Sequence, residues 1–113
     1  MTQADAANLL RPMLGFMAAM DWAGVVAMCG SSRVTADELA RVIREYGCTP
    51  CLPPDNYAEF VTVDQYLDGS EAGFFIVAPL WTVEEGRSDL SVEVTACWRG
   101  GQFALHLHDL HVL

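Results

Sequence analysis

The sequence contains no lysine, and its six basic residues are all arginines. They stand against fifteen Asp and Glu residues, which gives a formal net charge of −9 at pH 7. Such a surplus of negative charge repels phosphates and acidic lipid headgroups, so it excludes unaided binding to nucleic acid or to an anionic membrane. Long uncharged runs are also missing, since none approaches the ~20 residues that a membrane-spanning helix needs.

Proline and glycine, with 5 and 9 residues among 113, are too few for a linker or low-complexity protein. The hydrophobic share is 52%, so we expect a single α+β domain over residues 1–113. The apolar stretch Leu9–Met28 has the composition of a signal peptide, but Asp5 precedes it and Asp21 and Trp22 interrupt it. We therefore expect a cytoplasmic protein whose four cysteines are mostly reduced.

Helical patterns occupy the first half of the chain. Apolar residues at i, i+3, i+4 and i+7 begin at Leu10 and predict a helix that Asn8 caps, with Pro12 in its first turn. A short second helix is expected over residues 21–28. A third is expected over residues 35–47, because it opens with a Thr-Ala-Asp-Glu capping box and ends at a glycine.

Strand patterns occupy the second half. We expect strands over residues 59–63, 74–83 and 90–98, and a fourth after the Gly100-Gly101 turn. Residues 64–73 are expected to form a polar connection, and residues 84–89 a six-residue turn. Pro79 indicates that its strand lies at a sheet edge or contains a bulge. The predicted fold is two to three N-terminal helices packed on a meandering antiparallel sheet of about four strands.

The glycine pair fixes the register of the last hairpin. A two-residue turn there pairs Trp98–Phe103, Ala96–Leu105 and Val94–Leu107 on one face, and Cys97–Ala104, Thr95–His106 and Glu93–His108 on the other. If Val83 pairs with Leu90 in the preceding hairpin, an apolar strip lies opposite the core: Ile76, Ala78 and Leu80. The N-terminal helices or a second copy in a homodimer would cover such a strip.

Negative charge is concentrated in residues 55–93, which hold nine acids and one arginine, a net charge of −8. Such a field favours a basic partner and accelerates encounter with it. The simpler interpretation is that net charge only keeps a small domain dispersed. The candidate partner-binding residues are Asp64, Asp68, Glu71, Glu84, Glu85, Arg87, Asp89 and Glu93.

A Cys-x-x-Cys motif at Cys48 and Cys51 suits a redox dithiol or half of a zinc site. Redox catalysis is disfavoured because the motif follows a helix instead of preceding one. His106 and His108 share a face of the last strand and would complete four zinc ligands if the loop folded over them. The alternative is two ordinary loop cysteines and two histidines on a polar face, with Glu93 beside His108.

Acid–base catalysis would need a titratable pair inside a pocket, such as Asp109 with His111 or Glu93 with His108. In small scaffolds of the ketosteroid-isomerase type, helices on a curved sheet enclose such a pocket. The predicted fold resembles these scaffolds only at the level of architecture, and no residues match. The expected cavity is lined by Trp81, Trp98 and Phe103. Motifs for a nucleophile elbow, a phosphate loop or a zinc protease are missing from the sequence, so we expect no cofactor.

The string W-T-V-E-E-G-R-S-D-L at residues 81–90 is the most distinctive in the chain. Its structural interpretation is a hairpin turn satisfied by its own side chains, and its functional interpretation is a charged recognition loop. With the closing D-L-H-V-L and the helix end Glu45–Gly47, residues 35–113 resemble a family of small bacterial proteins of uncharacterised function. The resemblance implies an intracellular domain and no catalytic residues. Members of such families are often suspected of being immunity proteins for secreted toxins.

These observations favour a non-enzymatic binding module, an immunity or inhibitor protein that masks a basic toxin or effector. The alternative is a small-ligand-binding or catalytic pocket protein, and the third hypothesis is a zinc-stabilised structural domain.

Overall fold

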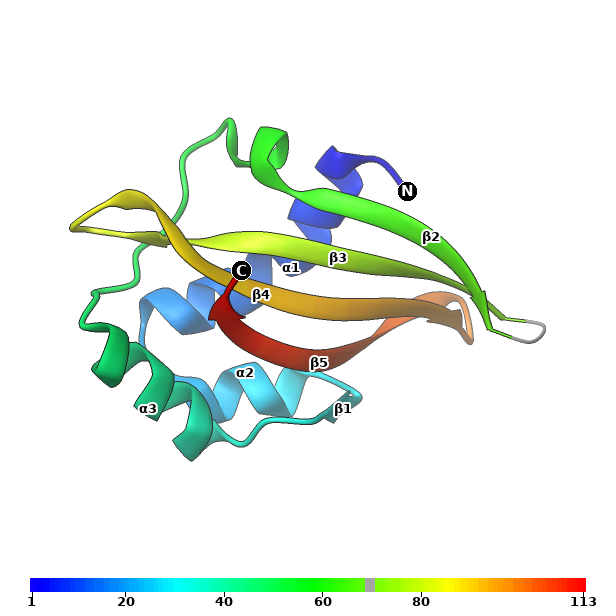
Figure 1. The fold of residues 1–113 in the computed structure, drawn as a ribbon. Helices are drawn as coiled ribbons and strands as arrows, with labels where there is room; N and C mark the ends of the chain where they lie inside the picture. Colours follow the sequence, from blue (N-terminus) through cyan, green and yellow to red (C-terminus); the bar gives the residue numbers. More distant parts are fainter. Residues whose placement is uncertain (69–70) are drawn as a thin grey trace.

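The computed structural model describes the backbone of residues 1–68 and 71–113, and the side chains of these residues except 66–68, 71 and 72. Its elements are α1 (Gln3–Ala18), α2 (Trp22–Met28), β1 (Ser31–Ser32), α3 (Ala36–Tyr46), the 3-10 helix η1 (Tyr57–Phe60), β2 (Thr62–Asp68), β3 (Glu71–Thr82), β4 (Gly86–Arg99) and β5 (Gln102–Val112). The strands form one sheet in the order β1-β5-β4-β3-β2 (Figure 1). The predicted α+β architecture is confirmed. The sheet has a fifth strand that was not expected, β1, which pairs parallel with β5.

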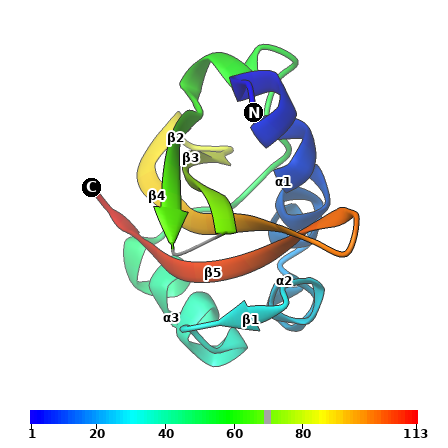
Figure 2. The same cartoon turned by 90° about the vertical axis from the view of Figure 1, so that its right-hand side faces the viewer.

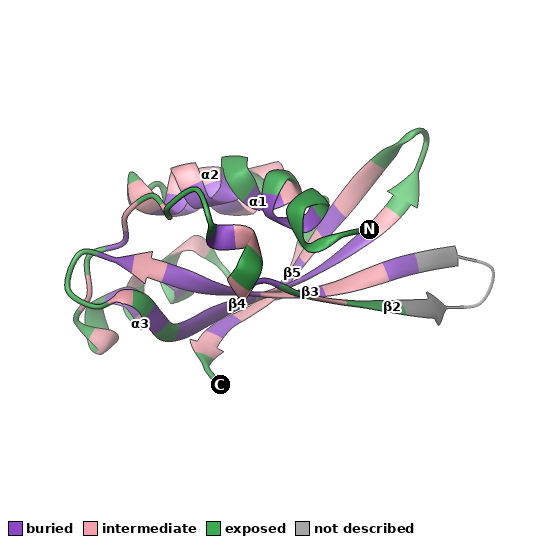
Figure 3. Cartoon of the chain, turned by 90° about the horizontal axis from the view of Figure 1, so that it is seen from above, coloured by how far each residue is buried: buried purple, intermediate pink, exposed green. Residues whose placement is uncertain are grey.

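Two of the helices lie on one side of this sheet, and the third lies at its edge. Helices α1 and α2 pack behind β3, β4 and β5, and α3 runs beside the β5 edge (Figures 1 and 2). Seen from above, α1 and α2 follow one side of the strands, and no described helix covers the other side (Figure 3). The sheet therefore has a covered face and a face that we call the open face.

Helix α1 begins at Gln3, earlier than expected, because Thr2 and not Asn8 is its N-cap. The Thr2 hydroxyl accepts a hydrogen bond from the backbone N–H of Asp5, and the Asp5 carboxylate accepts one from the backbone N–H of Thr2, both at 3.0 Å. This complete capping box satisfies two N–H groups that the helix itself leaves unpaired. Pro12 consequently lies inside the helix, and its predicted place in the first turn is wrong.

Helices α2 and α3 lie where the sequence predicts them. Asp21 caps α2, with its carboxylate accepting from the backbone N–H of Gly24 at 2.9 Å. Thr35 caps α3 and accepts from the backbone N–H of Glu38 at 3.1 Å. The chain leaves α3 through Gly47, whose φ of 79° is a left-handed conformation that glycine adopts readily. Local capping signals are enough to define these two helices.

The strand predicted over residues 59–63 is correct only at residues 62–63. The connection predicted over residues 64–73 is wrong where β2 and β3 run through it, and its residues 69–70 lie outside the described residues. Residues 57–60 form η1, while β2 runs through the polar segment from Thr62. The buried Tyr57 donates its hydroxyl hydrogen to the carbonyl oxygen of Pro79 at 2.5 Å, which anchors η1 against β3. As the edge strand, β2 exposes polar side chains to solvent, and this composition is what reads as a loop.

The β3–β4 hairpin is tighter than predicted, because Thr82 pairs with Gly86 and only residues 83–85 form the loop. The register shifts between Pro79 and Trp81, so the bulge predicted from Pro79 is confirmed. The apolar strip predicted opposite the core is absent from the open face. Its three residues face the helices, with exposed fractions of 0% or 1%: Ile76, Ala78 and Leu80.

The β4–β5 hairpin follows the predicted register from Trp98–Phe103 to Val94–Leu107. The next predicted pair is wrong, because a bulge at His108 places Glu93 opposite Asp109. An uninterrupted ladder would turn Asp109 toward the core, and burying an unpaired carboxylate costs several kcal/mol. The bulge keeps Asp109 on the open face and lets the next residue, Leu110, remain buried at 1% exposure.

The space between the helices and the covered face is filled by apolar side chains. Several of them have an exposed fraction of 0%: Leu10, Met13, Met17, Ile76, Val94 and Leu107. This packed core stabilises the sheet from one side only. Its strands therefore hold the side chains of the open face in place without depending on those side chains for stability.

Candidate functional site

Acidic side chains from three strands stand on the open face. The register places Asp64 of β2 in one row with Phe75, Thr95 and His106, and it places Glu93 of β4 opposite Asp109 of β5. Asp89 lies on the same face, beside Thr62 and Val77. The structure thus brings together three residues of the predicted partner-binding set, and it adds Asp109. The side chains of Asp68 and Glu71 lie outside the described residues.

The protein's three histidines are all on β5, and each bonds a polar neighbour on this face. The Nδ1 atom of His106 forms a hydrogen bond with the hydroxyl of Ser31, and the Nε2 atom of His108 forms one with the hydroxyl of Thr95. His111 Nε2 lies 2.8 Å from a carboxylate oxygen of Glu93. Its other ring nitrogen lies 3.9 Å from Asp109.

Two of these histidines have pKa values that move in opposite directions. The hydrogen bond with Glu93 raises the pKa of His111 above its ordinary value, and Asp109 adds to the effect. Partial burial lowers the pKa of His108, and so do the charges of His106 and Arg33. At neutral pH His108 is therefore neutral, while His111 holds its proton to higher pH than a free histidine does.

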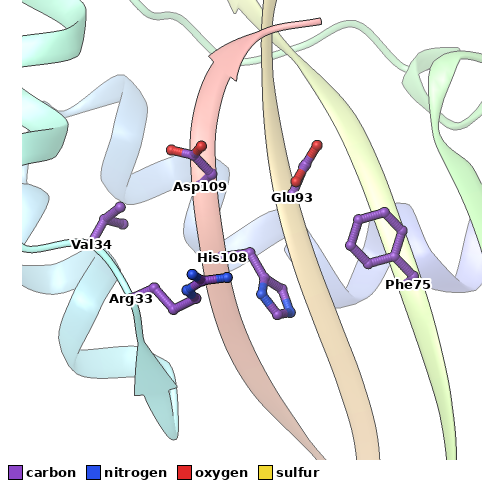
Figure 4. Close-up of a pocket in the computed structure, with 6 residues that line it drawn as sticks. All are labelled: Arg33, Val34, Phe75, Glu93, His108 and Asp109. Carbon is purple, nitrogen blue, oxygen red and sulfur yellow. The ribbon is translucent and has the colours of Figure 1, made fainter.

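A shallow depression of about 330 Å³ opens on this face. Its lining residues come from the β1–α3 connection and from β3, β4 and β5 (Figure 4): Arg33, Val34, Phe75, Glu93, His108 and Asp109. The backbone N–H of Arg33 donates to the carbonyl oxygen of Leu107 at 2.8 Å, which holds this segment beside β5. The sequence did not point to Arg33, because nothing in its local pattern shows that β1 joins the sheet beside β5. Phe75 was expected only as a strand residue.

The acids at the tip of the β3–β4 hairpin bond other parts of the chain. The Glu84 carboxylate accepts hydrogen bonds from the backbone N–H and the hydroxyl of Thr49, both at 2.8 Å, and these bonds lower its pKa. Glu85 accepts from the hydroxyl of Tyr46 at 2.9 Å. These contacts fasten the hairpin to the end of α3 and the loop after it. The prediction that residues 81–90 form a turn satisfied by its own side chains is wrong for Glu84 and Glu85, whose partners lie outside the string. It holds for the hydroxyls of Thr82 and Ser88, which accept from the backbone N–H groups of Glu85 and Leu90.

Arg87 lies apart from this arrangement, because its guanidinium stacks over the ring of Phe60 at 5.0 Å from the ring centroid. A cation over an aromatic face is attracted by the negative charge of that face. The residue borders the same part of the open face as Asp89. Arg87 therefore supplies a positive charge at the rim of the acidic surface.

The four suggested zinc ligands do not meet. The backbone N–H of Cys51 donates to Trp81 near the end of β3, whereas His106 shares a row with Phe75 near the other end. At about 3.3 Å per residue, this separation along the strand is about 20 Å. Among the described residues, no group of three or more His, Cys, Asp or Glu side chains is placed to hold a metal ion.

The predicted aromatic cavity is also wrong. Trp81 packs against Tyr57 and Phe60, with ring centroids 6.0 and 5.5 Å apart. Trp98 packs against Phe103 at 4.9 Å and is 57% exposed. The two tryptophans lie at opposite ends of the β3–β4 pair, so they do not border one space.

A family model described as a domain of unknown function, DUF7668, matches residues 17–113 of this chain. No curated protein and no solved structure matches the chain. No helix among the described residues is both long enough and apolar enough to cross a membrane.

Proposed function

The chain belongs to the DUF7668 family, and we propose that it is a non-enzymatic module that binds a basic protein through the open face of its sheet. The role that fits this activity is that of an immunity or inhibitor protein, which masks a basic toxin or effector. The observation that carries the proposal is a set of carboxylates on a sheet face that no described helix covers: Asp64, Asp89, Glu93 and Asp109.

The carboxylates are fixed by strands whose other face is packed against the helices. A surface held in this way loses little conformational entropy when a partner binds, so more of the contact energy is available for affinity. The surplus negative charge of residues 55–93 also attracts a basic partner over a distance. We therefore expect fast, salt-sensitive association.

The tip acids Glu84 and Glu85 have a supporting role in this proposal, because both are engaged by Thr49 and Tyr46. The proposal also places the protein in the cytoplasm, where thiols remain reduced. None of its four cysteines, all of which are described, forms a disulfide.

The test compares two variants with equal changes of charge. The first carries Asp64→Arg, Asp89→Arg and Asp109→Arg on the open face. The control carries Asp37→Arg, Glu45→Arg and Asp55→Arg, three exposed acids on α3 and in the loop after it. Each tagged protein is purified from its own host at low salt, and bound proteins are weighed by native mass spectrometry.

We expect the natural chain and the control to retain a basic protein at fixed stoichiometry, and to lose it as the salt concentration rises. The open-face variant should lose it at low salt as well, with affinity reduced at least tenfold. Equal retention by both variants would contradict the proposal, and so would equal loss from both.

A further inference from the structure

The rings of His106 and His108 lie closer together than two alternate residues of a regular strand would place them. Their ring centroids are 4.4 Å apart and the ring planes meet at 76°. Side chains two residues apart on a regular strand are separated by about 7 Å along it. The two imidazoles therefore contact each other on the open face, beside the bulge in β5.

Each ring is held by one nitrogen, which leaves the other available. His106 is bonded through Nδ1 to Ser31, and His108 through Nε2 to Thr95. Among the described residues, His106 Nε2 and His108 Nδ1 have no hydrogen-bond partner. A hydroxyl can accept the N–H of a ring whose other nitrogen binds a metal, and such a contact fixes both the tautomer and the ring orientation.

We propose that His106 and His108 form a two-histidine site for a late first-row divalent cation, of which Ni²⁺, Cu²⁺ and Zn²⁺ suit imidazole ligands. The cation binds His106 Nε2 and His108 Nδ1. Consider two imidazole nitrogens that bind one ion with bonds of about 2.1 Å and a nitrogen–metal–nitrogen angle of about 90°. The centroids of the two rings are then about 4.5 Å apart. The observed separation of 4.4 Å is close to that value.

The surroundings set the strength of the site. Glu93 and Asp109 line the same depression as His108 and favour a cation, while Arg33 in that depression opposes one. The described residues offer no third ligand, so water occupies the remaining coordination positions. Affinity should accordingly be modest, with a dissociation constant on the order of micromolar.

The experiment is a calorimetric titration of the purified chain with NiCl₂ at pH 7.5, without any partner protein. It uses the natural chain and the single variants His106→Ala, His108→Ala and His111→Ala. His111 is a matched control, because it lies on the same strand and face but bonds Glu93. The double variant Cys48→Ser/Cys51→Ser measures binding by thiols, and circular dichroism checks that each variant is folded.

We expect one Ni²⁺ per chain, at least a tenfold loss of affinity in His106→Ala and in His108→Ala, and no change in the other two variants. Replacement by asparagine repeats the test if an alanine variant fails to fold. Binding should also weaken at pH 5.5, because protons compete with the metal ion for imidazole nitrogens. The proposal is overturned if no stoichiometric binding is seen, or if His111→Ala or the cysteine variant abolishes it while the other histidine variants do not.

Discussion

The two faces of the sheet share a backbone but differ in what their side chains do. Along β5, Leu105, Leu107 and Leu110 are 6%, 0% and 1% exposed beneath the helices. The three histidines of the same strand bond a hydroxyl or a carboxylate on the open face. The covered face thus supplies most of the stability, and the open face supplies hydrogen-bonding and charged groups. We infer that substitutions on the two faces separate stability from binding.

The largest expected effect is on the covered face. Leu107→Ala removes a fully buried side chain from beneath the helices and should lower the free energy of unfolding by about 3 kcal/mol. His106→Ala, its neighbour on the open face, should change that free energy by less than about 1 kcal/mol. Urea denaturation of both variants measures the difference. Similar losses of unfolding free energy in the two variants would show that the two faces do not differ in their contribution to stability.

A smaller effect should distinguish two residues within the open face by pH. The raised pKa of His111 means that its contact with Glu93 adds stability below pH 6.5, the ordinary value, and that this stability is lost as pH rises through the higher native pKa. His111→Ala should therefore cost more at pH 5.5 than at pH 8.5. Because the pair is partly exposed, we expect a difference of about 0.5 kcal/mol.

His108→Ala should show the opposite trend. The native state lowers the pKa of His108, so the natural chain loses stability from this residue as pH falls below 6.5. The variant lacks that penalty, and its stability relative to the natural chain should improve at pH 5.5. Urea denaturation at pH 5.5 and 8.5, with reductant present, measures both trends. The same trend in both variants would contradict the assigned environments.

Sequence patterns predicted the parts of the fold that are decided locally. Thr35 and Gly47 bound α3, and the Gly100-Gly101 turn sets the register of the last hairpin. The bulge at His108 was not predictable in this way, because it depends on tertiary structure. It keeps the Asp109 carboxylate out of the core, which no local pattern shows. Strand β2 was missed because its edge position makes a polar sequence acceptable.

The candidate site was predictable only in part. The acidic segment 55–93 includes Asp64, Asp89 and Glu93, which share the open face. It also gave equal weight to Glu84 and Glu85, whose bonds to distant residues are visible only in three dimensions. Charge composition identifies acids, but pairing between strands decides which of them stand together.

The most direct test of the central claim is carboxyl footprinting of the protein, alone and with the basic protein that it retains at low salt. A carbodiimide reagent labels exposed carboxylates, and mass spectrometry measures the labelling of each residue. If the open face binds the partner, labelling of Asp64, Asp89 and Asp109 should fall several-fold in the complex, while Asp37, Glu45 and Asp55 should label as in the free protein. Protection of the second set without the first would contradict the account.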